Sequence, residues 1–420
     1  MRSVDVLVLG AGITGISAAL HLQGRGWNAL VVDAQGPGEV SSRGNTGILE
    51  RTGFLPLDVP SGAGEVLSSV LGRGPAMRIE ARTLPALLKF LRLARQHTAS
   101  PSVGRLARAL APLQSSAIGE HLAIARAASA FRFFRRTGWL KIYRSERGLA
   151  SCEVERHFAR IIGVPYEDCG AHDIARLEPD LVVHGAAGVF WPESQSVSSP
   201  GGVTKAYARF FRERGGEIAS GDPSSLEPAW SGWQVRTARG MVAANHVVLA
   251  LGADTLPLLA RFGLSMPLAE LCNRHRHFRA VSGVGLSRPV SDVDGGFLLT
   301  PMERGVRLVA DRQLAPAGRP GDEEAGSPGF ERAVERARAL MPLGASVEDV
   351  PVVGRRVLTP DGLPAIGQVP GAAGLWLQLG SGSAGFALAP AMGRMLAELM
   401  SGDPVFVDPV PFAPARLLVG

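Results

Sequence analysis

The chain has 420 residues and contains little lysine and little cysteine. Only three of its 44 basic residues are lysines, and its cysteines, Cys152, Cys169 and Cys272, form no Cys-x-x-Cys pair. This spacing excludes a dense disulfide framework and a zinc site with histidine. We therefore expect reduced thiols, no bound metal and a cytoplasmic location.

Long hydrophobic runs are also missing. The most apolar early stretch, residues 6–20, is too short to span a bilayer and has no basic flank or cleavage site. A membrane span and a secretory signal peptide are therefore not expected in this stretch.

Glycine and arginine, in contrast, are abundant. The 52 glycines follow no Gly-X-Y period, and 46% of the residues are hydrophobic, which excludes collagen and a low-complexity linker. The net charge of +6 comes with 41 arginines. Compositional bias explains this surplus, and so does binding of phosphate or lipid; both interpretations stay open. No nucleic-acid-binding motif is present, so nucleic acid is not an expected partner.

Residues 4–33 carry a dinucleotide-binding fingerprint. An apolar strand (4–9) runs into a glycine loop, a helix (16–23) and a second strand (29–32) that ends on an acid. The glycines and the acid are Gly10, Gly12, Gly15 and Asp33. In this pattern the glycines permit a tight turn, approach of a pyrophosphate and close helix packing, and the acid accepts a ribose hydroxyl. The acid argues against NADP, but the fingerprint alone does not separate FAD from NAD.

The loop that follows the second strand favours FAD, with a plain surface loop as the alternative, and two later glycine loops are expected to belong to the same site. A polar loop after the second strand suits a longer dinucleotide that reaches a flavin ring. A late strand (247–251) ends at a glycine, and a last strand (374–379) meets a Gly-Ser loop and a helix (387–399) whose positive N-terminus would stabilise a reduced flavin. Beyond the fingerprint, the expected FAD-binding residues are Ala34, next to Asp33, and, in these loops, Ser41, Ser42, Gly44, Asn45, Gly47, Gly252, Gly380, Ser381, Gly382 and Ser383.

Residues 84–145 form a basic region with amphipathic helical patterning. The region contains eleven lysines and arginines and a single acid, Glu120. A solvated face of cap-domain helices and a surface that rests on an anionic membrane both explain it.

Together, these motifs resemble the FAD-dependent D-amino acid dehydrogenase and glycine oxidase family (the DAO superfamily) along the whole chain. The resemblance also rests on 248–253 (Val-Leu-Ala-Leu-Gly-Ala) and 359–367 (Thr-Pro-Asp-Gly-Leu-Pro-Ala-Ile-Gly). It implies an α/β fold, with a Rossmann-like FAD-binding domain of the glutathione-reductase type and an interleaved α+β substrate domain. The expected ranges are 1–60, 196–262 and 350–420 for the FAD-binding domain, and 61–195 and 263–349 for the substrate domain.

The resemblance also implies a reaction. Family members oxidise a C–N bond of an amino acid or amine by hydride transfer to flavin N5, and water hydrolyses the imine. The electrons then pass to a quinone, another carrier or O₂. Arg356 and Arg307 match the family's pocket arginines, which suit a substrate carboxylate, and His275 and His277 match a pocket strand.

Several positions depart from the family pattern. Ser381 and Ser383 stand where relatives commonly have histidines, Val352 stands in place of a Trp, and 310–313 lacks the usual Gly-x-x-Glu. We therefore expect a roomier pocket and an unusual or bulkier substrate. A tailoring flavoprotein that acts on a carrier-bound or N-oxidised intermediate, and a non-catalytic flavoprotein subunit, are the alternatives. Because residues 263–313 contain no lysine to activate oxygen, a dehydrogenase is favoured over an oxidase.

Overall fold

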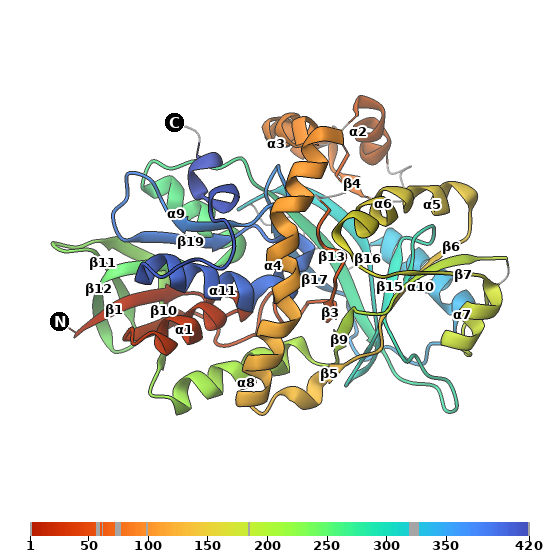
Figure 1. Cartoon of the computed structure of the whole chain (residues 1–420), viewed down its shortest axis with the longest axis horizontal. Helices are drawn as coiled ribbons and strands as arrows, with labels where there is room; N and C mark the ends of the chain where they lie inside the picture. The colour runs from red at the N-terminus through yellow and green to blue at the C-terminus, as the bar shows by residue number, and fades with distance from the viewer. Residues whose placement is uncertain are drawn as a thin grey trace.

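The computed structural model describes residues 2–55, 59–60, 62–71, 77–97, 100–183, 185–318 and 327–418. In this part of the chain two large sheets lie side by side, with most helices covering them (Figure 1). Helices and strands are both abundant, so the expected mixed α/β fold is confirmed.

The first sheet has a parallel core in the order β10-β2-β1-β12-β19, completed by antiparallel β11 and β18. Its strands are β1 (Arg2–Leu9), β2 (Ala29–Asp33), β10 (Glu217–Pro228), β11 (Trp233–Thr237), β12 (Gly240–Leu249), β18 (Ala365–Gln368) and β19 (Leu375–Leu379). The buried, β-branched sequences of β1 and β2 are typical of strands covered on both faces. The late strand β12 lies beside β1, so segments far apart in the sequence build one sheet.

Helices cover both faces of this sheet. One face packs against α1 (Ile13–Gly24), α8 (Pro200–Glu213) and α11 (Gly385–Ser401), and the other against α9 (Thr255–Arg261). A Cβ at Gly393 of α11 would lie 2.8 Å from the backbone nitrogen of Ala18 in α1. Only glycine permits these two helices to cross so closely. The predicted helices at 16–23 and 387–399 are confirmed.

The second sheet has nine strands, in the order β17-β13-β16-β15-β14-β6-β8-β7, with β4 paired to β16. Its strands are β4 (Arg78–Ile79), β6 (Trp139–Tyr143), β7 (Glu167–Cys169), β8 (Ala187–Trp191), β13 (Ala269–Phe278), β14 (Val290–Asp292), β15 (Phe297–Met302), β16 (Gly305–Pro316) and β17 (Val352–Leu358). Helix α10 (Pro328–Leu340) covers one face through a hydrophobic cluster that includes Phe278 and Phe330.

The two sheets bear on the expected division into domains. β17 pairs with β13 in the nine-stranded sheet, although it lies within the range 350–420 expected for the FAD-binding domain. The boundary expected at residues 60/61 falls on Ser61, which lies outside the described residues. The division into domains stays a prediction.

The remaining α-helices and a small third sheet lie around the two large sheets. They comprise α2 (Ala63–Val70), α3 (Leu84–His97), α4 (Ser100–Ala127), α5 (Glu146–Ser151), α6 (Glu153–Ile162), α7 (Ala171–Leu177), β3 (Ile48–Leu49), β5 (Phe134–Arg135) and β9 (Gln195–Val197). The long helix α4 runs across the molecule from the α3 end to α8 (Figure 1). Helical patterning in the basic region is thus confirmed for α3 and α4, while its last part forms β5 and β6.

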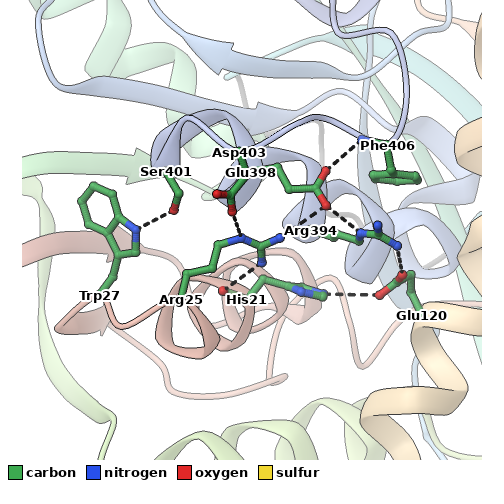
Figure 2. Close-up of polar contacts among 9 residues, drawn as sticks. All are labelled: His21, Arg25, Trp27, Glu120, Arg394, Glu398, Ser401, Asp403 and Phe406. Carbon is green, nitrogen blue, oxygen red and sulfur yellow. Dashed lines mark hydrogen bonds and ion pairs between the residues drawn. The ribbon is translucent and has the colours of Figure 1, made fainter.

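An ion-pair network fastens α4 to the first sheet's helices (Figure 2). Arg394 of α11 donates to Glu120 of α4 at 2.9 Å and to Glu398 at 2.8 Å. Arg25 at the end of α1 contacts Glu398 at 3.3 Å and Asp403 at 2.9 Å. Glu120, the single acid of the basic region, therefore anchors α4 to α11 and α1.

A buried histidine makes a second connection. Pro390 lies inside α11 and has no N–H for the carbonyl of Phe386, four residues earlier. Nε2 of His121, from α4, lies 2.7 Å from that carbonyl oxygen and can donate to it. Burial lowers the pKa of His121 to about 4. A neutral side chain of α4 thus satisfies a backbone group that α11 leaves unpaired.

Candidate functional site

The glycine loop between β1 and α1 is shaped by two tight backbone contacts. Gly10 has a φ of +108°, and a Cβ there would lie 2.5 Å from the carbonyl oxygen of Ala250. A Cβ at Gly15 would lie 1.9 Å from the carbonyl oxygen of Gly10. At Gly12, the N-cap of α1, a Cβ would meet only Ser42 Oγ, at 3.6 Å. The first and third glycines are thus required by the protein itself, and the second keeps the front of the helix open.

Asp33 supports this loop from the end of β2. Its Oδ2 accepts from the backbone nitrogen of Ala11 at 2.7 Å, and its Oδ1 accepts from those of Gln35 and Gly36 at 2.7 Å each. Ala34 is exposed beside it. The carboxylate therefore orders the loop, and Oδ2, which accepts one hydrogen bond from the protein, retains a lone pair for a ribose hydroxyl.

The polar loop 41–47 folds onto the same helix terminus. Ser42 Oγ is buried and accepts from the backbone nitrogen of Ile13 at 2.9 Å. Asn45 Oδ1 accepts from the backbone nitrogen of Gly47 at 2.9 Å. Gly47 has a φ of +72°, and a Cβ there would lie 2.4 Å from the carbonyl oxygen of Val197. Ser41 is exposed at the start of the loop.

The N-terminus of α1 fits a dinucleotide phosphate. Ser42 accepts only the N–H of Ile13, and within the described residues no partner is seen for the N–H groups of Thr14 and Gly15. These donors, the positive end of the helix dipole and the space at Gly12 form an anion-binding arrangement.

Two later loops lie at ends of strands in the same sheet. Gly252, after β12, has a φ of +60° and open space around its Cβ position. Gly380 and Gly382, after β19, have φ values of +79° and +55°. Ser381 bridges to Leu358 of β17, and the exposed Ser383 leads into α11. Small side chains and left-handed backbone therefore bring this loop directly against the second sheet.

Strand register determines which predicted pocket residues share a face. Directly opposed residues of neighbouring strands project to the same side of a sheet. Arg356 lies opposite Leu271 of β13, and Leu271 projects to the same side as His275 and His277, because alternate residues of a strand share a face. His277 in turn lies opposite Arg307. All four predicted pocket residues thus share one face, the face opposite α10. The register of β16, β15, β14 and β6 places Lys141 of β6 on the same face.

The polar loop presses against this face. A Cβ at Gly44 would lie 3.2 Å from Cε1 of His275 and 3.6 Å from Cα of Gly354 in β17. The loop expected to contact the cofactor and the strands expected to line the substrate pocket are therefore in direct contact.

Arg307 binds that loop. Its guanidinium donates to the backbone carbonyls of Arg43, at 3.0 Å, and Asn45. Its Nε donates to Nε2 of His277 at 3.0 Å, and Nδ1 of His277 lies 2.8 Å from Glu348. With three of its nitrogens engaged and 5% of its surface exposed, Arg307 does not present a free fork to a carboxylate. Its predicted role as a substrate ligand is not supported by this arrangement.

Both histidines are neutral at physiological pH. Burial, followed by the charge of Arg307, lowers the pKa of His277 to about 4 and that of His275 to about 2. The bonds of His277 imply a proton on Nδ1, which leaves Nε2 free to accept from Arg307. Nδ1 of His275 is buried and has no partner among the described residues.

Arg356 has a different environment. Within the described part of the chain, its guanidinium makes no hydrogen bond and no ion pair, whereas its neighbour Arg355 points to the other face and binds Glu270 at 2.6 and 2.9 Å. Burial, followed by the charge of Arg312, lowers the pKa of Arg356 to about 10, so it stays cationic at neutral pH. It is a charged bidentate donor available to a ligand.

Sequence reasoning missed three polar residues near this face: Glu348, Glu50 and Gln114. Glu348 fixes His277, and no spacing rule connects them because 71 residues separate them. Glu50 offered a weak signal, an acid directly after the apolar pair of β3. Gln114 lies within the basic region and could not be distinguished from other polar residues of a helix.

The described residues contain neither a candidate membrane span nor a candidate metal site. No helix there is both long and apolar enough to cross a membrane. No group of three or more histidine, cysteine or acidic side chains there is arranged to hold a metal ion.

Comparison with known proteins is decisive for the family. A family model described as FAD dependent oxidoreductase (DAO) matches residues 5–399. The chain belongs to this family. FAD is accordingly its cofactor, as expected from the glycine loops. The assignment of individual FAD-binding residues stays a prediction.

Members of the DAO family resemble this chain over nearly its whole length. A D-amino acid dehydrogenase of Cereibacter sphaeroides is 26% identical over 433 residues, covering 94% of this chain and 92% of that protein. The solved structure of glycine oxidase from Geobacillus kaustophilus has a TM-score of 0.75 at 21% identity and covers all of both chains. That of L-proline dehydrogenase from P. horikoshii has a TM-score of 0.73 at 16% identity, covering 99% of this chain and 98% of that one. The likeness to the two structures confirms the expected fold.

Proposed function

We propose that this flavoenzyme oxidises the C–N bond of an amino acid or of a secondary or cyclic amine to an imine. The observation that carries the proposal is Arg356, a cation on the sheet face that the loop at Gly44 touches and one that has no hydrogen-bond or ion-pair partner among the described residues. The relatives named above, D-amino acid dehydrogenase and glycine oxidase, support it. FAD, when bound, supplies the oxidant that accepts the hydride.

The residues of the chain bind and orient the substrate. The planar fork of Arg356 suits a bidentate contact with a carboxylate. His275, neutral and with an unpartnered Nδ1, presents a polar atom without adding charge. Arg307, supported by His277, holds the loop at Arg43 and Asn45 against the second sheet. This arrangement relies on positioning and charge rather than on a strong acid or base.

We further propose a bulkier substrate than the common D-amino acids. Val352 lies opposite His275, on the face of Arg356, and is 41% exposed. Ser381 and Ser383 are also smaller than the histidines that relatives commonly have at these positions. Two alternatives remain if no amine reduces the flavin in the experiment below. One is a tailoring reaction on a carrier-bound or N-oxidised intermediate, and the other is a flavoprotein subunit without catalysis.

The electron acceptor is proposed to be a quinone or another carrier rather than O₂. Residues 263–313 contain no lysine, and Lys141, which shares the face, is bound to Glu155 at 2.6 and 2.8 Å. A peripheral contact with the inner face of a membrane suits such an acceptor. Its support is an exposed set of apolar and basic side chains on α2 and α3: Leu67, Leu71, Leu88, Lys89 and Arg92.

Anaerobic titration of the FAD-loaded enzyme tests the proposed reaction. Amino acids and cyclic amines of increasing size should bleach the flavin absorbance, with the bulkier ones faster than D-alanine. Arg356→Met should raise the KM for carboxylate substrates about 100-fold, because a charged bidentate contact is lost. Arg332→Met, an exposed position on α10, is the control and should change nothing. Reoxidation by a soluble quinone should outpace that by O₂.

The opposite results are equally clear. Rapid bleaching by D-alanine would contradict the bulky substrate, and flavin that no amine bleaches would contradict C–N oxidation. Arg356→Met with an unchanged KM would remove Arg356 from the substrate site.

A further inference from the structure

A cluster of unpartnered oxygen acceptors lies near Arg356, where β3 ends. Gln114 of α4 donates through Nε2 to the backbone carbonyl of Glu50, which directs its Oε1 the other way. That Oε1 is buried and has no donor, and the hydroxyl of Thr52, also buried, has no partner among the described residues. The carboxylate of Glu50 likewise makes no hydrogen bond and no ion pair in this part of the chain.

The acceptors are close together. A Cβ placed on Gly53 would lie 3.1 Å from Oε1 of Gln114 and 3.2 Å from Cδ of Glu50, so both groups border the same point. Buried acceptors are normally paired, because leaving one without a donor costs about 1–3 kcal/mol. Several of them side by side indicate a ligand that brings N–H donors.

The nearby cations in the described part of the protein do not donate hydrogen bonds to these acceptors. Lys141, the nearest lysine on the face, uses its Nζ on both oxygens of Glu155. Burial raises the pKa of Glu50, and the charges of Lys141 and Arg356 lower it by less. Within the described residues, no salt bridge joins Glu50 to either one. The charges of Arg356 and Glu50 thus influence one another although the two side chains form no ion pair.

We propose that the substrate is held as a dipole, with its carboxylate on Arg356 and its N–H groups on Glu50 and Gln114. This rests on the proposed C–N oxidation and specifies it further: Glu50 and Gln114 recognise the amino or imino group of the substrate, so that a simple amine or a carboxylate alone is a poor ligand. Glu50 is then a specificity-determining residue, which discriminates by the N–H donor of the ligand.

A pair of ring compounds that cannot be oxidised in this way tests the proposal. Pyrrole-2-carboxylate and furan-2-carboxylate have the same shape and carboxylate, but only the pyrrole presents an N–H. Titrated into the FAD-loaded enzyme and followed by flavin absorbance, the pyrrole should bind about tenfold more tightly, equivalent to about 1.4 kcal/mol for one charge-assisted hydrogen bond.

Variants assign the preference to Glu50. Glu50→Leu should bring the ratio of the two dissociation constants to about one, and Glu50→Gln should retain part of it, because an amide oxygen still accepts. Glu335→Gln, an exposed acid on α10, should keep the wild-type ratio. Flavin content and melting temperature are measured for each variant, and if Glu50→Leu does not fold, Glu50→Gln decides.

A wild-type ratio near one, or a tenfold ratio that survives in the deciding variant, overturns the proposal. Bleaching of the flavin by an amine would still stand in that case, so the two proposals fail separately. Wild-type enzyme that neither ring compound perturbs also overturns the dipolar site.

Discussion

Two arginines of the same sheet face, Arg356 and Arg307, have different roles in this protein. Arg356 and Arg307 both match pocket arginines of the family, and both lie on one sheet face. Arg307 donates to two backbone carbonyls and a histidine, whereas Arg356 makes no such bond in the described structure. Their sequence contexts do not separate these roles, because two of the three partners of Arg307, the carbonyls of Arg43 and Asn45, lie more than 200 positions away in the sequence.

Removal of the Arg307 side chain should weaken FAD binding rather than substrate binding. Without its bonds to the carbonyls of Arg43 and Asn45, the loop loses a charged, buried anchor. Arg307→Met should raise the dissociation constant for FAD about tenfold or more, measured by fluorescence titration of the apoprotein. Arg332→Met should bind FAD normally. Unchanged FAD affinity in Arg307→Met would show that the loop is held by other contacts.

At the level of elements, glycine has a meaning that depends on its neighbours. Gly15 lies in the first turn of α1, against the carbonyl of Gly10, while Gly119 lies inside α4 with nothing within 4 Å of its Cβ position. The fingerprint identified Gly15 from spacing alone, because the strand–loop–helix unit is local. The environment of Gly119 depends on how α4 crosses the molecule, which no local pattern reports.

Alanine at these two positions should have opposite effects. Gly15→Ala places a Cβ 1.9 Å from a backbone oxygen, so it should lower the melting temperature and abolish FAD retention. Gly119→Ala should stabilise the protein by about 0.5–1 kcal/mol, because it removes a flexible residue from a helix interior. Thermal unfolding and the flavin content of purified protein measure both. A stable, yellow Gly15→Ala protein would contradict the close packing.

On the scale of the whole molecule, charge is distributed unevenly. The basic region contributes exposed Lys89 and Arg92 beside the exposed leucines of α2 and α3, yet Lys141 is bound to Glu155 and Glu120 serves the network of Figure 2. Other arginines of the region, among them Arg105, Arg108 and Arg126, are exposed as well. The membrane contact is proposed for the α2–α3 end because exposed leucines accompany the basic side chains there.

Vesicle binding tests this surface. The protein should co-sediment with vesicles that contain phosphatidylglycerol, but not with phosphatidylcholine alone, and binding should fall with salt. Lys89→Glu with Arg92→Glu should reduce binding at least about tenfold, since each basic residue contributes about 1 kcal/mol near an anionic surface. A control with the same change in charge, Arg212→Glu with Arg332→Glu, should bind as before. Equal loss in both would indicate a general effect of net charge.

What the sequence determined by itself is local and periodic. The apolar strands, the glycine loops that follow them and the helices after those loops occupy contiguous segments, so spacing alone predicts them and, with the family resemblance, FAD. The tertiary structure decided what lies opposite what. Strand pairing put Arg356, His275, Arg307 and Lys141 on one face, and crossing of α4 brought Gln114 to Glu50. These relations depend on register and packing between distant segments, and a change of register by one residue would send each side chain to the other face.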